Sequence, residues 1–303
     1  YELRNISDTV KNFGFKVFAD TVANGGAVRA VVVEDSADKF GRRDIDSLTD
    51  FVKTYRAKGL AWIKMGETVS SSFLKFLSDE EKDALIAALG LKDGDCAFIV
   101  ADKDQVTYEA LGALRCEVAK RLDKIPHDPA HPEDMYKLLW VTEFPLLEYS
   151  EEEGRYVAKH HPFTSPMFED LDLIDTNPGK VRAKAYDIVI NGMEAGGGSI
   201  RIYNSELQTK MFEVLGFTDE KAYAQFGFLI DAFRYGVPPH GGMAYGLDRL
   251  TMILAGRDSI RDVIAFPKVQ NASEIMTKSP GTVDDAQLKE LSIAVTAVEK
   301  DEE

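Results

Sequence analysis

The chain has 303 residues, of which 45% are hydrophobic and 29% are charged. These values are ordinary for a soluble globular protein and allow a core to form without disulfides or a structural metal. The length predicts about two domains. The net charge of −15 argues against a surface that binds nucleic acid by charge alone.

Targeting and redox signals are sparse. No apolar run approaches the roughly 18 to 20 residues of a membrane span, and no signal peptide is visible. Cys96 and Cys116 have no CxxC spacing, so we expect two buried thiols in a reducing compartment and a cytoplasmic location. Because the chain opens at Tyr1 rather than Met, we expect a fragment, although processing would give the same start.

Residues 1–132 are predicted to form an alternating α/β unit. Their 19 basic and 22 acidic residues give a net charge of −3, against −12 for residues 133–303. Apolar β-branched runs predict strands, and helical apolar spacing predicts helices. The predicted strands are Ala27–Val33, Leu60–Met65 and Cys96–Val100, and the predicted helices are Asp44–Lys58 with Gly59 as C-cap, Ser71–Leu77, Asp79–Leu89 and Tyr108–Leu122.

A domain boundary is predicted near residues 125–132, which contain three prolines. Prolines at this density favour an extended connector over a continued helix. His127 and His131 lie in it, but no cysteine or third histidine accompanies them. We therefore interpret them as linker histidines and not as a metal site.

Residues 133–303 are predicted to form an α+β domain with an antiparallel sheet, because strands joined by short turns precede a group of helices. The tail from Asp284 is expected to begin as a helix and to end in solvated acidic residues. The predicted strands are Leu138–Phe144, Tyr156–Lys159, Ala185–Ile190 and Gly198–Tyr203, and the predicted helices are Ser205–Leu215, Glu220–Tyr235 and Leu247–Leu254.

A glycine-rich hairpin offers two carboxylates. Asn191-Gly192 between apolar runs predicts a two-residue type I′ turn, and in the regular register Asp187 faces Gly196. Since side chains alternate faces along a strand, Asp187 and Glu194 share a face and lie about 7–8 Å apart at the backbone. That separation lets both hold one Mg²⁺, directly or through water.

Arg201 lies seven residues after Glu194, which would place it on the opposite face of a regular strand. A bulge within the Gly196–Gly198 run would reset the register, so that Arg201 joins the carboxylates and offers its planar fork to a substrate carboxylate. The alternative is a surface hairpin in which Arg201 pairs with one of the acids. No Gly-Lys-Ser/Thr follows the glycines, so this run is not a P-loop.

A second arginine follows a proline- and glycine-rich stretch at residues 238–246. A helix is expected to begin near Gly246, which places Arg249 in its first turn, where backbone N–H groups and the helix dipole favour anions. Its guanidinium can stack on a base and approach a phosphate. The alternative is a surface pair between Asp248 and Arg249.

Two adjacent histidines, His160 and His161, begin the segment HHPFTSP at the end of a predicted strand. Either could contact a polar substrate group near neutral pH. A structural pair at the strand end is the alternative, and the residues alone leave both interpretations open.

The stretches HHPFTSP, YDIVINGMEAGGGSIRIY and HGGMAYGLDRL resemble the aspartyl-tRNA synthetases of class II, bacterial type. The last stretch is similar to motif 3 of that class, and residues 1–132 resemble the GAD domain that these enzymes insert between motifs 2 and 3. The resemblance covers essentially the whole chain. It implies an antiparallel class II catalytic domain, of which residues 133–303 form the C-terminal half.

The resemblance also implies roles for individual residues. His160 and Arg201 would bind aspartate, with Arg201 on its side-chain carboxylate, and Asp187 and Glu194 would hold the Mg²⁺ that accompanies ATP. ATP would be bound by Glu194, Gly246, Leu247, Asp248 and Arg249, with Arg249 on the adenine, and Arg201, Arg249 and Glu194 would carry the catalysis.

The implied reaction joins L-aspartate to ATP, giving aspartyl-adenylate and pyrophosphate, and then transfers the aspartyl group to tRNA. It needs positioning and charge neutralisation but no covalent nucleophile. The chain lacks motif 1, which supplies the homodimer interface in this class, motif 2 and the anticodon-binding domain. We therefore expect it to be inactive alone.

Two alternative functions are consistent with parts of the sequence. Asparaginyl-tRNA synthetases share motif 3, but the GAD-like segment and the Arg201 fork speak against that assignment. GAD domains also occur in a tRNA-dependent amidotransferase subunit, so a non-catalytic binding module is the second alternative. The residues leave open whether the parent enzyme charges tRNA-Asp alone or tRNA-Asn as well.

Overall fold

A computed structural model describes residues 1–124 and 132–296. The chain divides into two compact units, Tyr1–Tyr136 and Lys137–Glu303, here called unit 1 and unit 2. The sequence placed the domain boundary after residue 132. Most of the predicted connector, with His127 and His131, lies outside the described residues, as does the acidic end of the tail.

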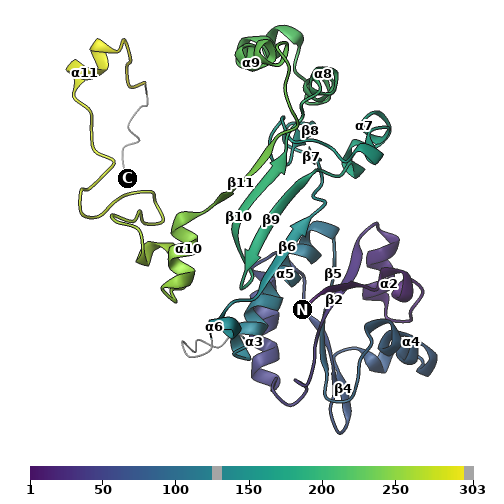
Figure 1. Cartoon of the computed structure of the whole chain (residues 1–303). Helices are drawn as coiled ribbons and strands as arrows, with labels where there is room; N and C mark the ends of the chain where they lie inside the picture. The colour runs from purple at the N-terminus through teal and green to yellow at the C-terminus, as the bar shows by residue number, and fades with distance from the viewer. Residues whose placement is uncertain (125–131, 297–303) are drawn as a thin grey trace. The chain divides into compact units, whose positions relative to one another are not determined.

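Unit 1 is built on a five-stranded sheet in the order β1-β2-β5-β3-β4, with every pairing antiparallel (Figure 1). Apolar side chains fill both of its faces: one cluster packs α3 and α5 against the sheet, and the other packs α1, α2 and α4. The elements are β1 Leu3–Asn5, α1 Ser7–Val10, α2 Lys16–Ala23, β2 Ala27–Val33, α3 Arg42–Lys53, β3 Ala61–Met65, β4 Val69–Ser71, α4 Asp79–Leu89, β5 Cys96–Asp102 and α5 Asp104–Arg121.

The predicted strands of unit 1 are confirmed, and two of its predicted helices need correction. The helix expected to reach Lys58 ends at Lys53, and Arg56 has a φ of 69°; Gly59 is therefore not its C-cap. The helix expected at Ser71–Leu77 is a single 3₁₀ turn, Leu74–Phe76. By contrast, α4 ends at Gly90, whose φ of 57° is the left-handed conformation that favours glycine.

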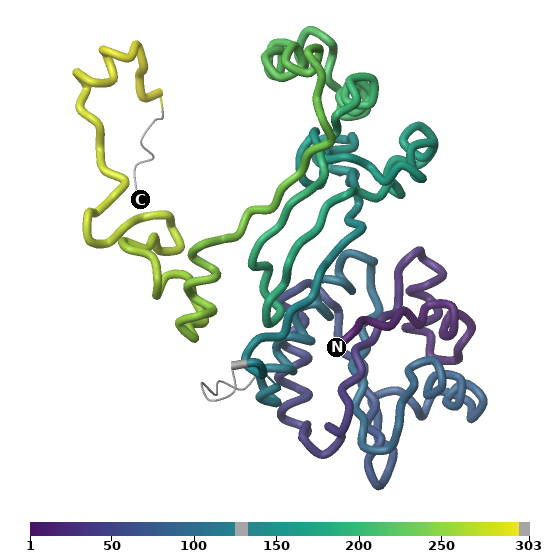
Figure 2. The backbone as a smooth tube through the Cα atoms, viewed as in Figure 1, coloured from purple at the N-terminus to yellow at the C-terminus, as the bar shows by residue number. Residues whose placement is uncertain are grey.

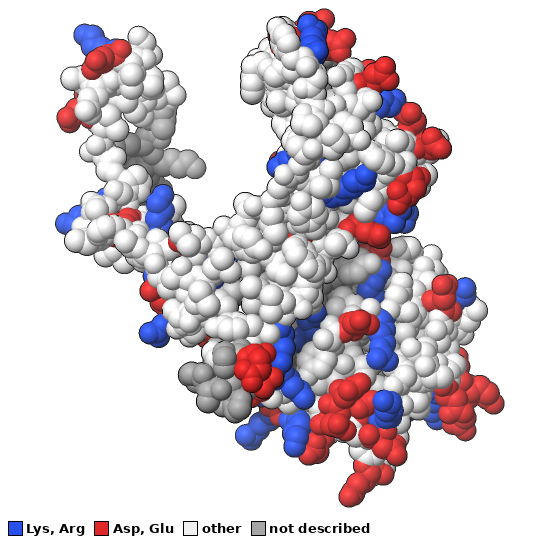
Figure 3. Space-filling model, viewed as in Figure 1, with Lys and Arg blue, Asp and Glu red and all other residues white. Residues whose placement is uncertain are grey.

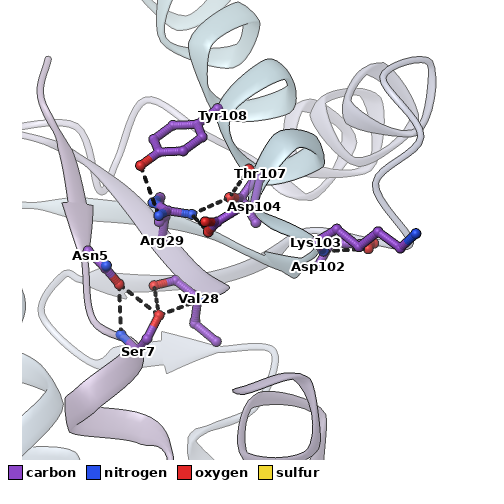
Figure 4. A network of polar contacts seen from close by, with 9 residues as sticks. All are labelled: Asn5, Ser7, Val28, Arg29, Asp102, Lys103, Asp104, Thr107 and Tyr108. Carbon is purple, nitrogen blue, oxygen red and sulfur yellow. Dashed lines mark hydrogen bonds and ion pairs between the residues drawn. The ribbon is translucent and has the colours of Figure 1, made fainter. Parts of the chain in front are cut away.

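A buried arginine fastens α5 to the sheet of unit 1 (Figure 4). Arg29 on β2 donates hydrogen bonds to Asp104 at 2.7 Å, to the Thr107 hydroxyl at 2.7 Å and to the Tyr108 hydroxyl at 2.9 Å. Its guanidinium carbon also lies 3.9 Å from the centre of the Tyr108 ring. Because the charge is paired and hydrogen-bonded, this polar cluster stabilises the fold and offers little to a ligand.

Unit 2 contains a four-stranded antiparallel sheet in the order β11-β10-β9-β6 and a separate hairpin of β7 and β8 (Figure 1). The fold is of the predicted α+β class. The short helix α6, Pro132–Met135, still belongs to unit 1. The elements of unit 2 are β6 Leu138–Thr142, β7 Leu147–Ser150, β8 Arg155–Ala158, α7 Leu173–Thr176, β9 Ala185–Ile190, β10 Met193–Ile200, α8 Ser205–Val214, α9 Asp219–Phe233, β11 Gly241–Tyr245, α10 Leu247–Leu254 and α11 Asp285–Glu290.

Two strands of unit 2 were not predicted: β7, and β11, which was read as a loop. The sequence of β11, Gly-Gly-Met-Ala-Tyr, contains no β-branched residue, so local propensity gives no signal. It forms a strand because Gly241–Tyr245 pairs along β10. Figure 2 shows the two backbone segments running side by side. The predicted strand Gly198–Tyr203 overlaps β10 only at its last three residues, because β10 begins at Met193 and ends at Ile200.

The visible face over β9, β10 and β11 carries few charged side chains (Figure 3).

The two cysteines differ in burial. Cys96 is buried, and burial raises the pKa of its thiol to about 12. Cys116 is exposed, which corrects the expectation of two buried thiols, because it lies on the outer face of α5. Across residues 1–124 and 132–296, no helix combines the length and apolar character that a membrane crossing requires.

Candidate active site

The turn between β9 and β10 is the predicted one. Asn191 and Gly192 have φ values of 53° and 80°, as a two-residue type I′ turn requires. Ile190 and Met193 are the first pair on either side of it. This turn fixes the register from which the positions of the acidic side chains follow.

A bulge then brings both acids to one face. Glu194 pairs with Val189, but Gly197 pairs with Asp187, so Ala195 is an extra residue on β10. Val189 and Asp187 are two residues apart on β9 and share a face. Glu194 and Asp187 therefore project from the same face of the sheet.

The predicted bulge exists, but one residue earlier than expected. We placed it within residues 196–198, with Asp187 opposite Gly196, whereas the register shifts at Ala195 and Asp187 lies opposite Gly197. The glycines are unavailable for a bulge because they pair on both sides, with β9 and with β11. The consequence drawn from the bulge is unchanged: Arg201, four residues after Gly197, continues the face that carries the two acids.

The glycine run lets neighbouring groups approach the backbone closely. A Cβ on Gly197 would overlap the carboxylate of Asp187, and one on Gly198 would overlap the carbonyl oxygen of Gly242 on β11. A Cβ on Gly196 would lie 2.6 Å from the carbonyl oxygen of Ala244. These positions therefore admit glycine because strands and side chains occupy the space of a Cβ.

The negative charge of Glu194 acts on the protonation of Asp187. Burial raises the pKa of Asp187, and the negative charge of Glu194 raises it further, whereas His160 lowers it. Repulsion of this kind between neighbouring carboxylates is relieved when a cation binds between them. The carboxylate of Asp187 is thus electrostatically prepared for a positive ligand, whereas that of Glu194 already lies 3.5 Å from Nη1 of Arg249.

Arg201 contacts a histidine and not an acid. Its Nη1 lies 3.0 Å from Nδ1 of His161, and its backbone joins an isolated bridge with Thr164. Within the described part of the chain, no ion pair links Arg201 to a carboxylate, so the alternative of a paired surface arginine is not what the structure shows. The guanidinium keeps donors for a ligand.

Arg249 reaches back from α10 to the hairpin. Gly246 caps the N-terminus of α10, as predicted. Nη1 of Arg249 donates to the backbone carbonyl of Glu194 at 2.8 Å and lies 3.5 Å from its side-chain oxygen Oε1. Among the ion pairs of the described residues, Arg249 pairs with Glu194 and not with Asp248, which was the predicted alternative.

These groups line one open pocket of about 530 Å³. The pocket contains six of the eight predicted site residues: His160, Asp187, Glu194, Arg201, Gly246 and Arg249. Leu247 and Asp248 are not part of its lining, and Leu247 is 76% exposed. His161 also lines the pocket. The residues alone left either histidine open as a substrate contact, and the resemblance named only His160.

Ser199 is a pocket residue that sequence reasoning missed. It lies on the same face as Gly197 and Arg201, its side chain is 3% exposed, and its hydroxyl has no hydrogen-bond partner in the part of the chain that the structure describes. The sequence signal that could have found Ser199 is its position two residues before Arg201, because residues two apart on a strand share a face. A buried hydroxyl without a partner in a pocket floor is available to a ligand.

A Mg²⁺ ion fits the donor set in one specific way. Among residues 1–124 and 132–296, no cluster of three or more metal-ligating side chains occurs. Mg²⁺ is commonly held by one or two carboxylates, with water and substrate phosphates completing the octahedron. Asp187 and Glu194 therefore suit a Mg²⁺ that arrives with a phosphate ligand, and they do not form a complete protein cage.

Comparison with known proteins shows the family to which the chain belongs. The family model for class II tRNA synthetases (D, K and N) matches residues 20–270. The chain is 57% identical over 296 residues to the aspartate–tRNA(Asp/Asn) ligase of Lachnoclostridium phytofermentans, which covers 97% of this chain and 48% of that protein. The aspartate–tRNA ligase of Ruminiclostridium cellulolyticum is also 57% identical over 296 residues, covering 97% of this chain and 49% of that protein.

The chain thus spans about half the length of the curated relatives it matches. Among solved structures, an aspartyl tRNA synthetase from Entamoeba histolytica aligns with 81% of this chain and 44% of its own. That alignment has 18% sequence identity and a TM-score of 0.37.

Proposed function

Because this chain belongs to the class II tRNA synthetases of the D, K and N group, we propose that it supplies part of an active site that activates L-aspartate. The proposed reaction couples aspartate and ATP to give aspartyl-adenylate and pyrophosphate, followed by transfer of the aspartyl group to tRNA. The observation that carries the proposal is the convergence of Arg201 with Asp187 and Glu194 on one face of the sheet. The names of the relatives at 57% identity support it.

The choice among aspartate, asparagine and lysine follows from Arg201. Its guanidinium offers a fork that matches a carboxylate with two parallel hydrogen bonds. A lysine substrate would bring a second positive charge to the guanidinium. An asparagine amide has one acceptor oxygen, whereas the two parallel N–H donors of the guanidinium need two. Aspartate is therefore the side chain that the pocket favours.

The nucleotide end of the pocket lies toward Glu194 and Arg249. In the proposal, Arg249 packs on the adenine, and Gly246, Leu247 and Asp248 form the surrounding motif 3 surface. Asp187 and Glu194 would hold Mg²⁺, which would neutralise the charge of the ATP phosphates. His160, whose ring lies 5.0 Å from that of Phe144, would contact the bound aspartate.

Location and assembly are part of the same proposal. Both cysteines are free thiols and one of them is exposed, as is usual for proteins of a reducing compartment, so we assign a cytoplasmic location. A homodimer and a tRNA partner belong to the proposed activity of the full-length gene product. Residues 1–132 are proposed to be a GAD domain.

The test is aspartate-dependent ATP–pyrophosphate exchange by the full-length gene product, with asparagine and lysine as competing substrates. Arg201→Lys keeps the charge but removes the fork, and we expect kcat/KM for aspartate to fall about 100-fold. Arg234→Lys is the matched control, because Arg234 is 71% exposed and pairs with Asp231 outside the pocket. Preference for asparagine over aspartate by the wild type would refute the assignment.

A further inference from the structure

The hydrogen bond between Arg201 and His161 has a direction that the geometry fixes. Nη1 of Arg201 lies 3.0 Å from Nδ1 of His161, and the backbone nitrogen of Phe163 lies 3.2 Å from the same atom. A guanidinium and a backbone N–H can only donate. Nδ1 therefore accepts both hydrogen bonds, so the imidazole is neutral and carries its proton on Nε2.

The surroundings favour the same neutral form. Partial burial lowers the pKa of His161, and the charges of Arg201 and of the adjacent His160 lower it further. The Thr164 hydroxyl, 3.4 Å from both ring nitrogens, carries no charge. The other titratable side chains in the pocket lining come from β9, β10, β11 and α10, and are Asp187, Glu194, Tyr245 and Arg249.

We propose that His161 is a positioning residue that holds the Arg201 guanidinium in place for the substrate carboxylate, and that protonation of His161 releases it. The inference rests on the proposed function, because it takes aspartate as the substrate. An arginine side chain loses considerable rotamer entropy when it is ordered. If His161 orders it before aspartate binds, the substrate does not bear that cost.

Protonation would remove this support in two ways. An imidazolium has no acceptor, so the hydrogen bonds from Arg201 and Phe163 would both be lost. It would also place a second positive charge beside the guanidinium. Because the pKa is lowered, the neutral form persists through neutral pH, and aspartate affinity should weaken only as the pH falls below about 6.5, the ordinary value for histidine.

The experiment measures KM for aspartate and for ATP between pH 5.5 and pH 8 in the full-length gene product, using ATP–pyrophosphate exchange. For His161→Ala we expect KM for aspartate to rise about 10- to 100-fold, the usual loss for a hydrogen bond to a charged group, with KM for ATP unchanged. The matched control is His240→Asn, because the His240 side chain lies outside the pocket lining, where its Nδ1 contacts the Pro238 carbonyl. Its backbone carbonyl, which accepts a hydrogen bond from the Arg201 backbone nitrogen at 2.9 Å, is not altered by this substitution.

His161→Asn separates positioning from packing. The Asn Oδ1 stands near the place of Nδ1 and accepts hydrogen bonds, but it does not titrate. This variant should keep KM for aspartate within about threefold of the wild type at pH 7.5 and should lose the rise in KM at low pH. A merely structural role would lower the melting temperature of both variants without restoring the affinity in His161→Asn.

Three outcomes would overturn the proposal while leaving the proposed function intact. They are an unchanged KM for aspartate in His161→Ala, a wild-type affinity for aspartate that rises as the pH falls, and failure of His161→Asn to restore binding. A rise at low pH would mean that the imidazolium itself binds the carboxylate. Failure of the proposed function looks different, since the wild type would then show no aspartate-dependent exchange at any pH.

Discussion

Two groups of polar side chains, one in each unit, differ in how fully they are paired. In unit 1, Arg29 is buried, and its guanidinium donates hydrogen bonds to Asp104, Thr107 and Tyr108. In unit 2, partial burial and then the charge of Glu194 raise the pKa of Asp187, and Ser199 keeps a buried hydroxyl for which the described residues provide no partner. Satisfied groups hold a fold together, whereas groups left in need of a partner prepare a site for a ligand.

The largest effect is expected where this preparation depends on a missing side chain. In Gly197→Ala the new Cβ would overlap the Asp187 carboxylate and displace it. A displacement of about 1 Å in a reacting group can lower kcat about 100-fold. We expect that loss in ATP–pyrophosphate exchange by the full-length gene product, with no change in the stability of unit 1. Activity close to wild type would show that the position of Asp187 is not critical.

Next in size is the loss of the satisfied arginine. Arg29→Met should lower the free energy of unfolding of unit 1 by about 2–3 kcal/mol, because the Thr107 and Tyr108 hydroxyls lose their partner. The chain has two tryptophans, Trp62 on β3 of unit 1 and Trp140 on β6 of unit 2. Urea unfolding in a Trp140→Phe background therefore reports on unit 1. Arg43→Met, at an exposed position of α3, should change little, and equal effects of the two variants would contradict the structural role of Arg29.

Glycines in the two units should respond in opposite directions. Gly112 lies inside α5, and an added Cβ meets no atom within 4 Å. Because alanine favours helix formation, Gly112→Ala should stabilise unit 1 by about 0.5–1 kcal/mol. The same Trp62 fluorescence would measure this gain. A loss of stability would indicate a packing requirement at Gly112 like that at Gly197.

The smallest effect tests whether Asp187 lowers stability in exchange for function. Its pKa is raised in the folded state, so the contribution of this group to stability is fully present below the unfolded pKa and is lost as the pH rises through the folded pKa. Removing the charge should therefore help at neutral pH. We expect Asp187→Asn to melt about 1–2 °C higher at pH 7, with no gain near pH 3 and with loss of Mg²⁺-dependent activity. A lower melting temperature at pH 7 would mean that the carboxylate stabilises the fold.

The sequence predicted the parts of the site better than their arrangement. The hairpin turn, the start of α10 and the need for a bulge could all be read from short segments, because turn residues and strand parity are local properties. The position of the bulge could not, since it depends on β11 pairing with the glycines of β10 from more than forty residues away. The partner of Arg201 was missed for a related reason: the 161–166 segment is brought to Arg201 by tertiary contacts that no local pattern encodes.

By itself, then, the sequence predicted an organisation in two parts, the fold class, three of the five strands of unit 1 and a set of candidate site residues. Tertiary structure decided which of them meet. It placed Asp187 opposite Gly197. It also formed the hydrogen bonds of Arg249 with Glu194 and of Arg201 with His161. Propensity and periodicity act over a few residues, whereas these contacts depend on pairings between distant strands and on the space that glycines leave open.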